Sequence, residues 1–149
     1  MAAGIKYTSL PKGLSLANKE DVTGASTSPI STKYYERTFI IRLPIVASAS
    51  AQAIAYTSIK GWPTKYAKVV SSAVNIITAE STGTTKTVSL GYAGSTTTFV
   101  NAQSVATATT IAGVGATANL AATNLSYTLG SNNFAEAVLE AILKVECID

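Results

Sequence analysis

The segment between Leu139 and Ile148 limits the possible folds more than any other part of the sequence. Apolar and polar residues alternate along it, with Ile142 as the exception. The apolar set is Leu139, Ala141, Leu143, Val145 and Cys147, and the charged set is Glu140, Lys144 and Glu146. A period of two predicts a half-buried β-strand. A helix over residues 134–145 competes, because an Asn can cap it and the segment contains good helix formers, but the strict alternation favours the strand.

Other β-rich segments, separated by Gly, Ser, Thr and Asn, extend this pattern over most of the chain. Residues 95–104 are the exception: they are predicted to form a polar excursion with one helical turn, which Phe99 anchors to the core. No long amphipathic helix is predicted, so we expect an all-β fold, an antiparallel β-sandwich with about seven to nine strands, and a jelly roll as the preferred topology. Strands are expected at residues 36–44 (ending at Pro44), 45–59 (one or two strands), 67–81, 86–94, 104–115 and 123–131.

The first 35 residues differ from the rest, because no period of 2 or 3.6 persists in them. They carry scattered apolar residues, which argue against full disorder. We therefore predict two parts, an extended N-terminal arm over residues 1–35 and a β-sandwich domain over residues 36–149. The arm residues expected to contact a partner include Ile5, Tyr7, Leu10 and Leu14.

Charge is sparse and unevenly distributed, since Asp, Glu, Lys and Arg make up 13% of the chain. Residues 1–68 hold nine basic residues and three acids, whereas residues 69–149 hold two basic residues and five acids. Two explanations remain open: the halves present complementary surfaces to neighbouring proteins, or they mix on one surface. The net charge of +3 is too small to indicate nucleic-acid binding by itself.

Residue types that carry catalysis are scarce. The chain has no histidine and a single cysteine, Cys147, which we expect to be a buried apolar residue. Gly91 and Gly94 follow a strand pattern as in phosphate-binding loops, but neither the lysine of a P-loop nor the acid of a dinucleotide site follows them. A Lys86–Ser89 pair and a Glu80–Glu136 pair are conceivable without motif support, so we predict no enzyme, no cofactor and no metal site.

Aromatic residues lie beside basic ones in "KYYER" and "KGWPTKY". Such clusters occur on nucleic-acid surfaces and, as Tyr, Trp and Arg, in protein interfaces. The second explanation is favoured, so the predicted interface residues also include Tyr34, Tyr35, Arg37 and Trp62. Trp62 with Lys60 and Lys65 is in addition the one candidate for a sugar site.

No apolar run is long enough to span a membrane, and "MAAGIKYTSLPKG" lacks the apolar region of a signal peptide. We therefore expect no membrane association and folding in a reducing cytoplasm.

The segment "KTVSLGYAGSTTTFVNAQSVAT" resembles a pattern in virion structural proteins of tailed bacteriophages, in which a V-x-L-G strand leads into a small-residue turn. The flanking "AKVVSSAVNIITAESTGTTK" and "LSYTLGSNNFAEAVLEAILKVECI" extend the resemblance over residues 66–148. Among such proteins the chain is most similar to capsid decoration, or cement, proteins.

This resemblance implies a homotrimer that binds the major capsid protein on the outer surface of the virion capsid, after assembly in the host cytoplasm. It implies no catalysis and no direct contact with nucleic acid. The alternatives are a receptor- or carbohydrate-binding sandwich of a fibre and a tail or neck component.

Overall fold

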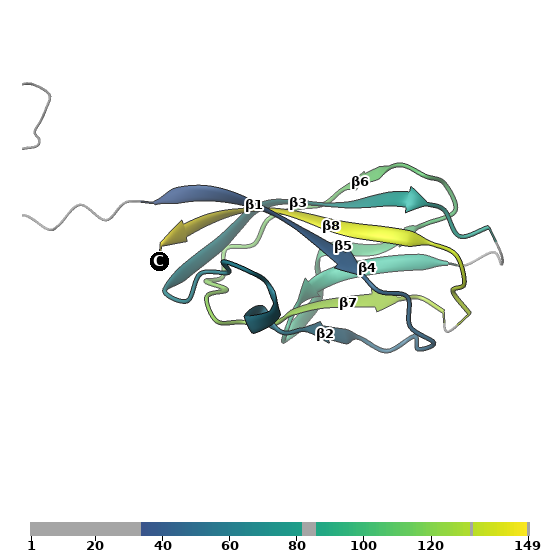
Figure 1. The fold of residues 1–149 in the computed structure, drawn as a ribbon, viewed down its shortest axis with the longest axis horizontal. Coiled ribbons are helices and arrows are strands. Elements are labelled where there is room, and N and C mark those ends of the chain that lie inside the picture. The colour runs from purple at the N-terminus through teal and green to yellow at the C-terminus, as the bar shows by residue number, and fades with distance from the viewer. Residues whose placement is uncertain (1–33, 82–85, 132, 149) are drawn as a thin grey trace, which may run out of the picture. The chain divides into compact units, whose positions relative to one another are not determined.

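The computed structural model describes residues 34–81, 86–131 and 133–148. The described residues form two four-stranded antiparallel sheets, with strand orders β1-β8-β3-β6 and β2-β7-β4-β5 (Figure 1). The strands are β1 (Tyr35–Leu43), β2 (Gln52–Ile54), β3 (Tyr66–Thr78), β4 (Thr87–Tyr92), β5 (Ser95–Ser104), β6 (Thr110–Ala112), β7 (Leu125–Leu129) and β8 (Val138–Ile148); a short 3₁₀ helix, η1, spans Tyr56–Ser58. The prediction of an all-β antiparallel sandwich is confirmed.

The strand pairs are nested within one another along the sequence. Strand β4 pairs with β5, β3 with β6, β2 with β7 and β1 with β8. The described chain is thus a long hairpin wound so that alternate nested pairs fall in different sheets. The first and last strands lie side by side, and β8 lies between β1 and β3.

Strand β8 confirms the prediction for the C-terminal segment, and the competing helix is wrong. The apolar set from Leu139 to Cys147 has no solvent exposure, whereas Lys144 is exposed. Both edges of β8 are hydrogen-bonded to neighbouring strands, so only its faces differ in environment. In this segment the two-residue period of apolar residues therefore predicted the structure correctly, whereas the helix propensity of its residues did not.

Residues 95–104 correct the prediction of a helical excursion, because they form strand β5 in a hairpin with β4. Tyr92 pairs with Ser95 across the two-residue turn, and Gly94 has a φ of 95°, a conformation that favours glycine. A Cβ atom at Gly91 would collide with the backbone carbonyl oxygen of Ser95. Phe99 is 2% exposed and is a core residue as expected.

Two other segments form less strand than predicted. Residues 45–59 contribute only the three-residue β2 and helix η1, and residues 104–115 contribute only the three-residue β6. Both short strands lie at sheet edges, where they pair with a single neighbour. Residues 45–59 are rich in Ala and Ser, and residues 104–115 are rich in Ala and Thr. These small side chains bury little apolar area to offset the cost of ordering a longer edge strand.

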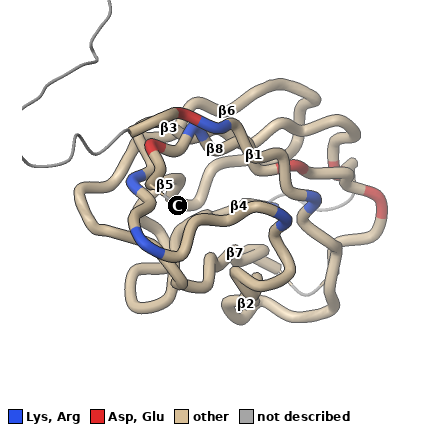
Figure 2. The backbone as a smooth tube through the Cα atoms, turned by 60° about the vertical axis from the view of Figure 1, so that its left-hand side comes forward, with Lys and Arg blue, Asp and Glu red and all other residues tan. Residues whose placement is uncertain are grey.

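Charged residues from the two halves of the sequence mix within one sheet among the described residues. Figure 2 shows where the basic and acidic residues lie along the backbone. Arg42 of β1 lies opposite Glu140 of β8, and Lys68 of β3 lies opposite Glu146. The antiparallel pairing of β1 and β3 with β8 interleaves the basic and acidic segments. Of the two explanations for the charge asymmetry, mixing on one surface is the correct one for this part of the chain.

Replacement of Leu143 by Ala should lower the free energy of unfolding by about 2–5 kcal/mol, because it leaves a cavity between the sheets. The neighbouring Ile142→Ala is the matched control, since Ile142 is only half-buried. Chemical denaturation of both variants measures the difference. Equal losses in the two variants would contradict the assignment of the strand's faces.

Candidate functional site

The predicted interface residues at the start of β1 lie together. Arg37 donates hydrogen bonds to the carbonyl oxygen of Gly61 and, at 3.3 Å, to the hydroxyl oxygen of Tyr35. Its guanidinium carbon lies 5.1 Å from the centre of the Tyr35 ring. Tyr34 is 54% exposed and packs edge-on against Tyr66, with ring centres 5.4 Å apart. These contacts present a preordered aromatic and basic surface at the point where residues 1–33 join the sandwich.

The other predicted interface residues have two different outcomes. Ile5, Tyr7, Leu10 and Leu14 lie outside the described residues. Trp62 is 6% exposed, packs against Phe39 and donates its Nε1 hydrogen bond to the carbonyl oxygen of Leu120 at 3.0 Å. Because its ring is buried, Trp62 is a core residue of the sandwich and offers no face to a sugar beside Lys60 and Lys65.

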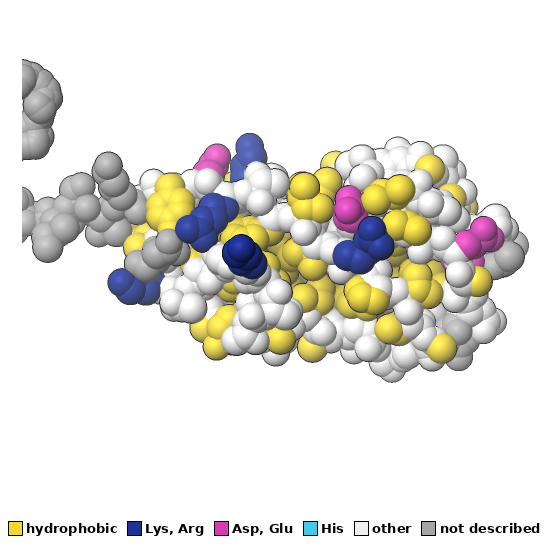
Figure 3. All heavy atoms as spheres, in the orientation of Figure 1, with side chains coloured by type: hydrophobic (Ala, Val, Ile, Leu, Met, Phe, Trp, Pro, Cys, Tyr) yellow, Lys and Arg dark blue, Asp and Glu magenta, His cyan; other side chains and the backbone are white. Residues whose placement is uncertain are grey.

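A groove of about 640 Å³ opens between the edge strands β1 and β2. Figure 3 shows apolar side chains in a hollow on this face of the molecule, with basic side chains beside it. Its walls come from Thr38 to Arg42 and Pro44, from Ala53 to Ala55, from Ser58 to Lys60, and from Tyr127. Sequence reasoning missed the groove because these segments lie far apart in the chain and meet only through the sheet pairing.

Tyr127 lies at the base of the groove and is 3% exposed. Its hydroxyl donates a hydrogen bond to the carbonyl oxygen of Pro44 at 2.7 Å, which ties β7 to the end of β1. Burial raises the pKa of the Tyr127 phenol, because the phenolate would lose its hydration.

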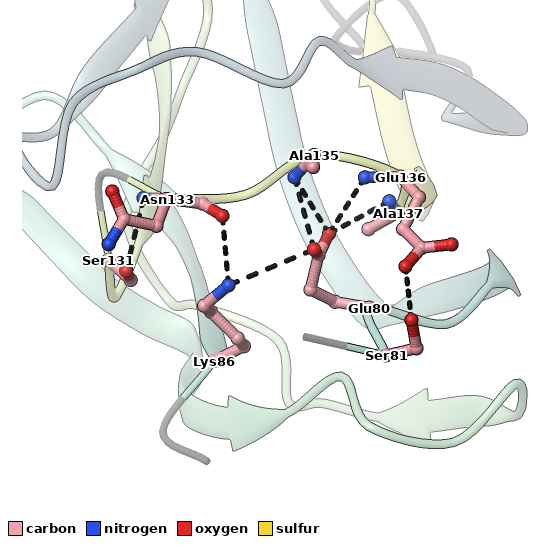
Figure 4. Close-up of polar contacts among 8 residues, drawn as sticks. All are labelled: Glu80, Ser81, Lys86, Ser131, Asn133, Ala135, Glu136 and Ala137. Atoms are coloured by element: carbon pink, nitrogen blue, oxygen red, sulfur yellow. Dashed lines mark hydrogen bonds and ion pairs between the residues drawn. The ribbon is translucent and has the colours of Figure 1, made fainter. Parts of the chain in front are cut away.

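A buried pair of charged residues, Glu80 and Lys86, joins the end of β3 to the start of β4 (Figure 4). Glu80 is 1% exposed, and Lys86 is 8% exposed. The Glu80 carboxylate accepts hydrogen bonds from the backbone N–H groups of Ala135, Glu136 and Ala137 at 3.0–3.1 Å. Lys86 Nζ lies 3.8 Å from Glu80 Oε2 and donates a hydrogen bond to the Asn133 carbonyl oxygen at 2.9 Å.

These contacts fill the hydrogen-bonding capacity of the Glu80 carboxylate and hold the segment that leads into β8. Three successive N–H donors and an ammonium group leave Glu80 without an open position for a substrate or metal. Glu136 uses its carboxylate differently, as the acceptor of a hydrogen bond from the Ser81 hydroxyl. The two carboxylates therefore do not face each other across a cleft, as a glycosidase would require.

The conceivable Lys86–Ser89 pair is not formed. The Ser89 hydroxyl oxygen accepts a hydrogen bond from the Ala102 backbone N–H at 2.9 Å, while Lys86 is held by Glu80 and Asn133. Within the described ranges no three His, Cys, Asp or Glu side chains gather as metal ligands. No helix in the same part of the chain is long and apolar enough to cross a membrane.

Comparison with known proteins identifies one solved structure with a similar fold. No family model and no curated protein matches the chain. The structure is similar to a chain of the "Cyanophage Pam1 capsid asymmetric unit", with a TM-score of 0.54 and 15% sequence identity, over 93% of this chain and 99% of that chain. At this identity the similarity shows a shared fold over nearly the whole length of both chains.

Replacement of Glu80 by Gln should lower the free energy of unfolding by about 3–5 kcal/mol, because Lys86 would keep a buried charge without its partner. The matched control is Glu136→Gln, which removes an exposed carboxylate from the segment before β8 that Glu80 contacts. Denaturant titration near neutral pH measures both variants. A loss of stability no larger than that of the control would contradict the proposal that Glu80 stabilises the fold through Lys86 and the N–H groups of residues 135–137.

The stability difference between the wild type and Tyr127→Phe should narrow as the pH rises above about 10. The raised pKa means that the folded state holds the phenol proton more tightly than the unfolded state does. The contribution of Tyr127 to the free energy of unfolding is therefore complete below the pKa of the phenol in the unfolded state. It is lost as the pH rises through the pKa of the phenol in the folded state. Unfolding free energies of both proteins from pH 8 to pH 11 test this. A constant difference over that range would be inconsistent with a buried, hydrogen-bonded phenol.

Proposed function

We propose that the chain is a non-catalytic structural protein of a phage virion, specifically a decoration protein bound to the major capsid protein. The observation that carries this proposal is the fold similarity to a chain of a capsid asymmetric unit. The alignment covers 99% of that chain, so the similarity extends over the whole of the solved chain and not over a part of it.

The described side chains support an adhesive rather than a catalytic role. The buried charges Glu80 and Lys86 are satisfied within the fold. The exposed Tyr34 and Tyr35 and the half-buried Arg37 gather at one end of β1. Tyr and Arg are enriched in the energetically important parts of protein interfaces. We assign these three residues to the surface that contacts the capsid.

We further infer that the sandwich is a jelly roll. Four nested strand pairs wound into two four-stranded sheets give the eight strands and the paired Greek keys of that topology. Such a rigid sandwich is suited to a protein that reinforces a shell, because its function needs a fixed surface and no moving part.

The proposed assembly is a homotrimer on the outer surface of the capsid, put together in the host cytoplasm. Residues 1–33 would be arms that contact capsid subunits; the predicted boundary at residue 35 moves to 33 because Tyr34 packs on Tyr66 and Tyr35 begins β1. Three copies would engage several capsid sites at once, and the effective concentration of each further site raises the total affinity. The proposal includes no direct contact with nucleic acid and no membrane partner.

The purified chain should bind capsids that lack it and raise the temperature at which they are disrupted. Cosedimentation and thermal disruption assays measure the two effects, and light scattering of the free protein measures the trimer. Failure to bind any capsid form would overturn the proposed function.

A truncated protein that begins at Tyr34 should remain folded and bind capsids more weakly. Tyr34→Ala in the full chain should also weaken binding, whereas the exposed Val114→Ala serves as its control. If truncation unfolds the sandwich, residues 1–33 belong to the core and the arm assignment is wrong.

A further inference from the structure

We propose that the groove between β1 and β2 accepts an extended strand from a second protein, in which apolar side chains alternate with carboxylates. Identification of that second protein as a capsid protein rests on the proposed function. The strand-binding property itself rests only on the geometry and charge of the groove.

Strand β1 has the backbone required to pair with an added strand. It pairs with β8 along one edge over nine residues, from Tyr35 to Leu43. No hydrogen bond to another described strand occupies its other edge. An extended strand directs its N–H and C=O groups alternately to both edges. From Thr38 to Arg42 the free edge therefore presents donors and acceptors to which no described strand is hydrogen-bonded.

The groove follows this free edge, because five consecutive β1 residues, Thr38 to Arg42, contribute to its wall. Five residues of strand extend over about 17 Å, enough for a complementary segment of about five residues. Strand β2 lies across the groove and is itself an edge strand, paired only with β7. The edge strands of the two sheets therefore form the two walls of a slot on this side of the sandwich.

The floor of the slot determines which side chains the added strand would point inward. It is formed by the apolar residues Phe39, Ile41, Ile54 and Ile59 together with the ring of Tyr127. Side chains of a strand alternate between faces, so every second residue of the added strand would meet this floor. Burial of those residues favours Val, Ile or Leu at the inward positions.

The charges at the groove determine the outward positions. Arg42 and Lys60 lie in its wall, and no carboxylate does. Arg42 faces Glu140 on β8 but forms no ion pair with any residue of the described ranges. Both basic side chains are exposed at the surface. Carboxylates on the added strand would complement them, which gives the alternation of apolar and acidic residues.

Charge also argues against residues 1–33 of another copy as the occupant. That segment carries four lysines and two acids, so it is basic like the groove. A strand from a different, acidic segment fits better than exchange of this chain's own N-terminal residues.

Synthetic peptides test the proposal without capsids. The probe is a capped nonapeptide that alternates Val with Glu, and its two controls are the Val–Lys peptide and the Val–Glu peptide methylated on alternate backbone nitrogens. The full chain should bind the first peptide at least tenfold more tightly than either control in fluorescence anisotropy. Amide chemical shift changes should centre on residues 38–42 and 53–55.

Variants of the chain separate the roles of charge and shape. Arg42→Glu and Lys60→Glu should each weaken Val–Glu binding by severalfold, whereas Lys65→Glu, an exposed site outside the groove wall, should not. Ala53→Trp should block the groove, and the matched control is Ala112→Trp, because both alanines are exposed in three-residue edge strands. Circular dichroism verifies that each variant is folded.

Several results would overturn the proposal. The first is that the Val–Glu peptide does not bind even at millimolar concentration. The second is that the methylated peptide binds as tightly as the Val–Glu peptide. The third is that the Ala53→Trp protein binds the Val–Glu peptide as tightly as the wild type does. Much tighter binding by the protein that begins at Tyr34 would show that residues 1–33 occupy the groove, which would overturn the second-protein occupant. The capsid assay can succeed or fail independently of these results, so the two proposals are tested separately.

Discussion

The pairing of β8 with β1 on one side and β3 on the other is the interaction on which the rest of the structure depends. It joins the beginning, the middle and the end of the described chain, with paired residues from Tyr35 to Leu43 and from Tyr66 to Thr78. Because side chains alternate along β8, a one-residue slip would move its entire apolar set to the solvent face. The buried row from Leu139 to Cys147 therefore fixes the register of the sheet, and the Glu80 carboxylate holds the loop that leads into it.

Nested pairing leaves each of the two sheets with edge strands. Edge strands are where another strand can pair with the molecule. The short strands β2 and β6 cover little of the sandwich, whereas β1 is a nine-residue strand at the edge of its sheet. Long free edges are usually protected, for example by charge, and Arg42 supplies such a charge beside the groove. A protected edge with an apolar floor is selective, because it discourages neutral strands and favours an acidic one.

The chemistry of the described residues is consistent with this adhesive role. Among the described charged residues, Glu80 and Lys86 are the least exposed, and their contacts with each other and with the backbone stabilise the fold. The sparse surface charge and the aromatic cluster at the start of β1 suit contacts with other proteins. A rigid sandwich with few mobile charged side chains also loses little conformational entropy when it becomes part of an assembly.

The sequence by itself determined the all-β class, the strands β1, β3, β4, β7 and β8, and the buried face of β8, because a two-residue period and β-branched residues act locally. It predicted the importance of Gly94 but not that the polar residues after it form β5, since Thr-rich segments suit both loops and exposed strands. Only the tertiary structure decided that Trp62 is buried and that Glu80 meets the N–H groups of residues 135–137. The same holds for the groove beside β1, because these features arise where segments far apart in the chain are brought together, and a local pattern contains no information about its distant neighbours.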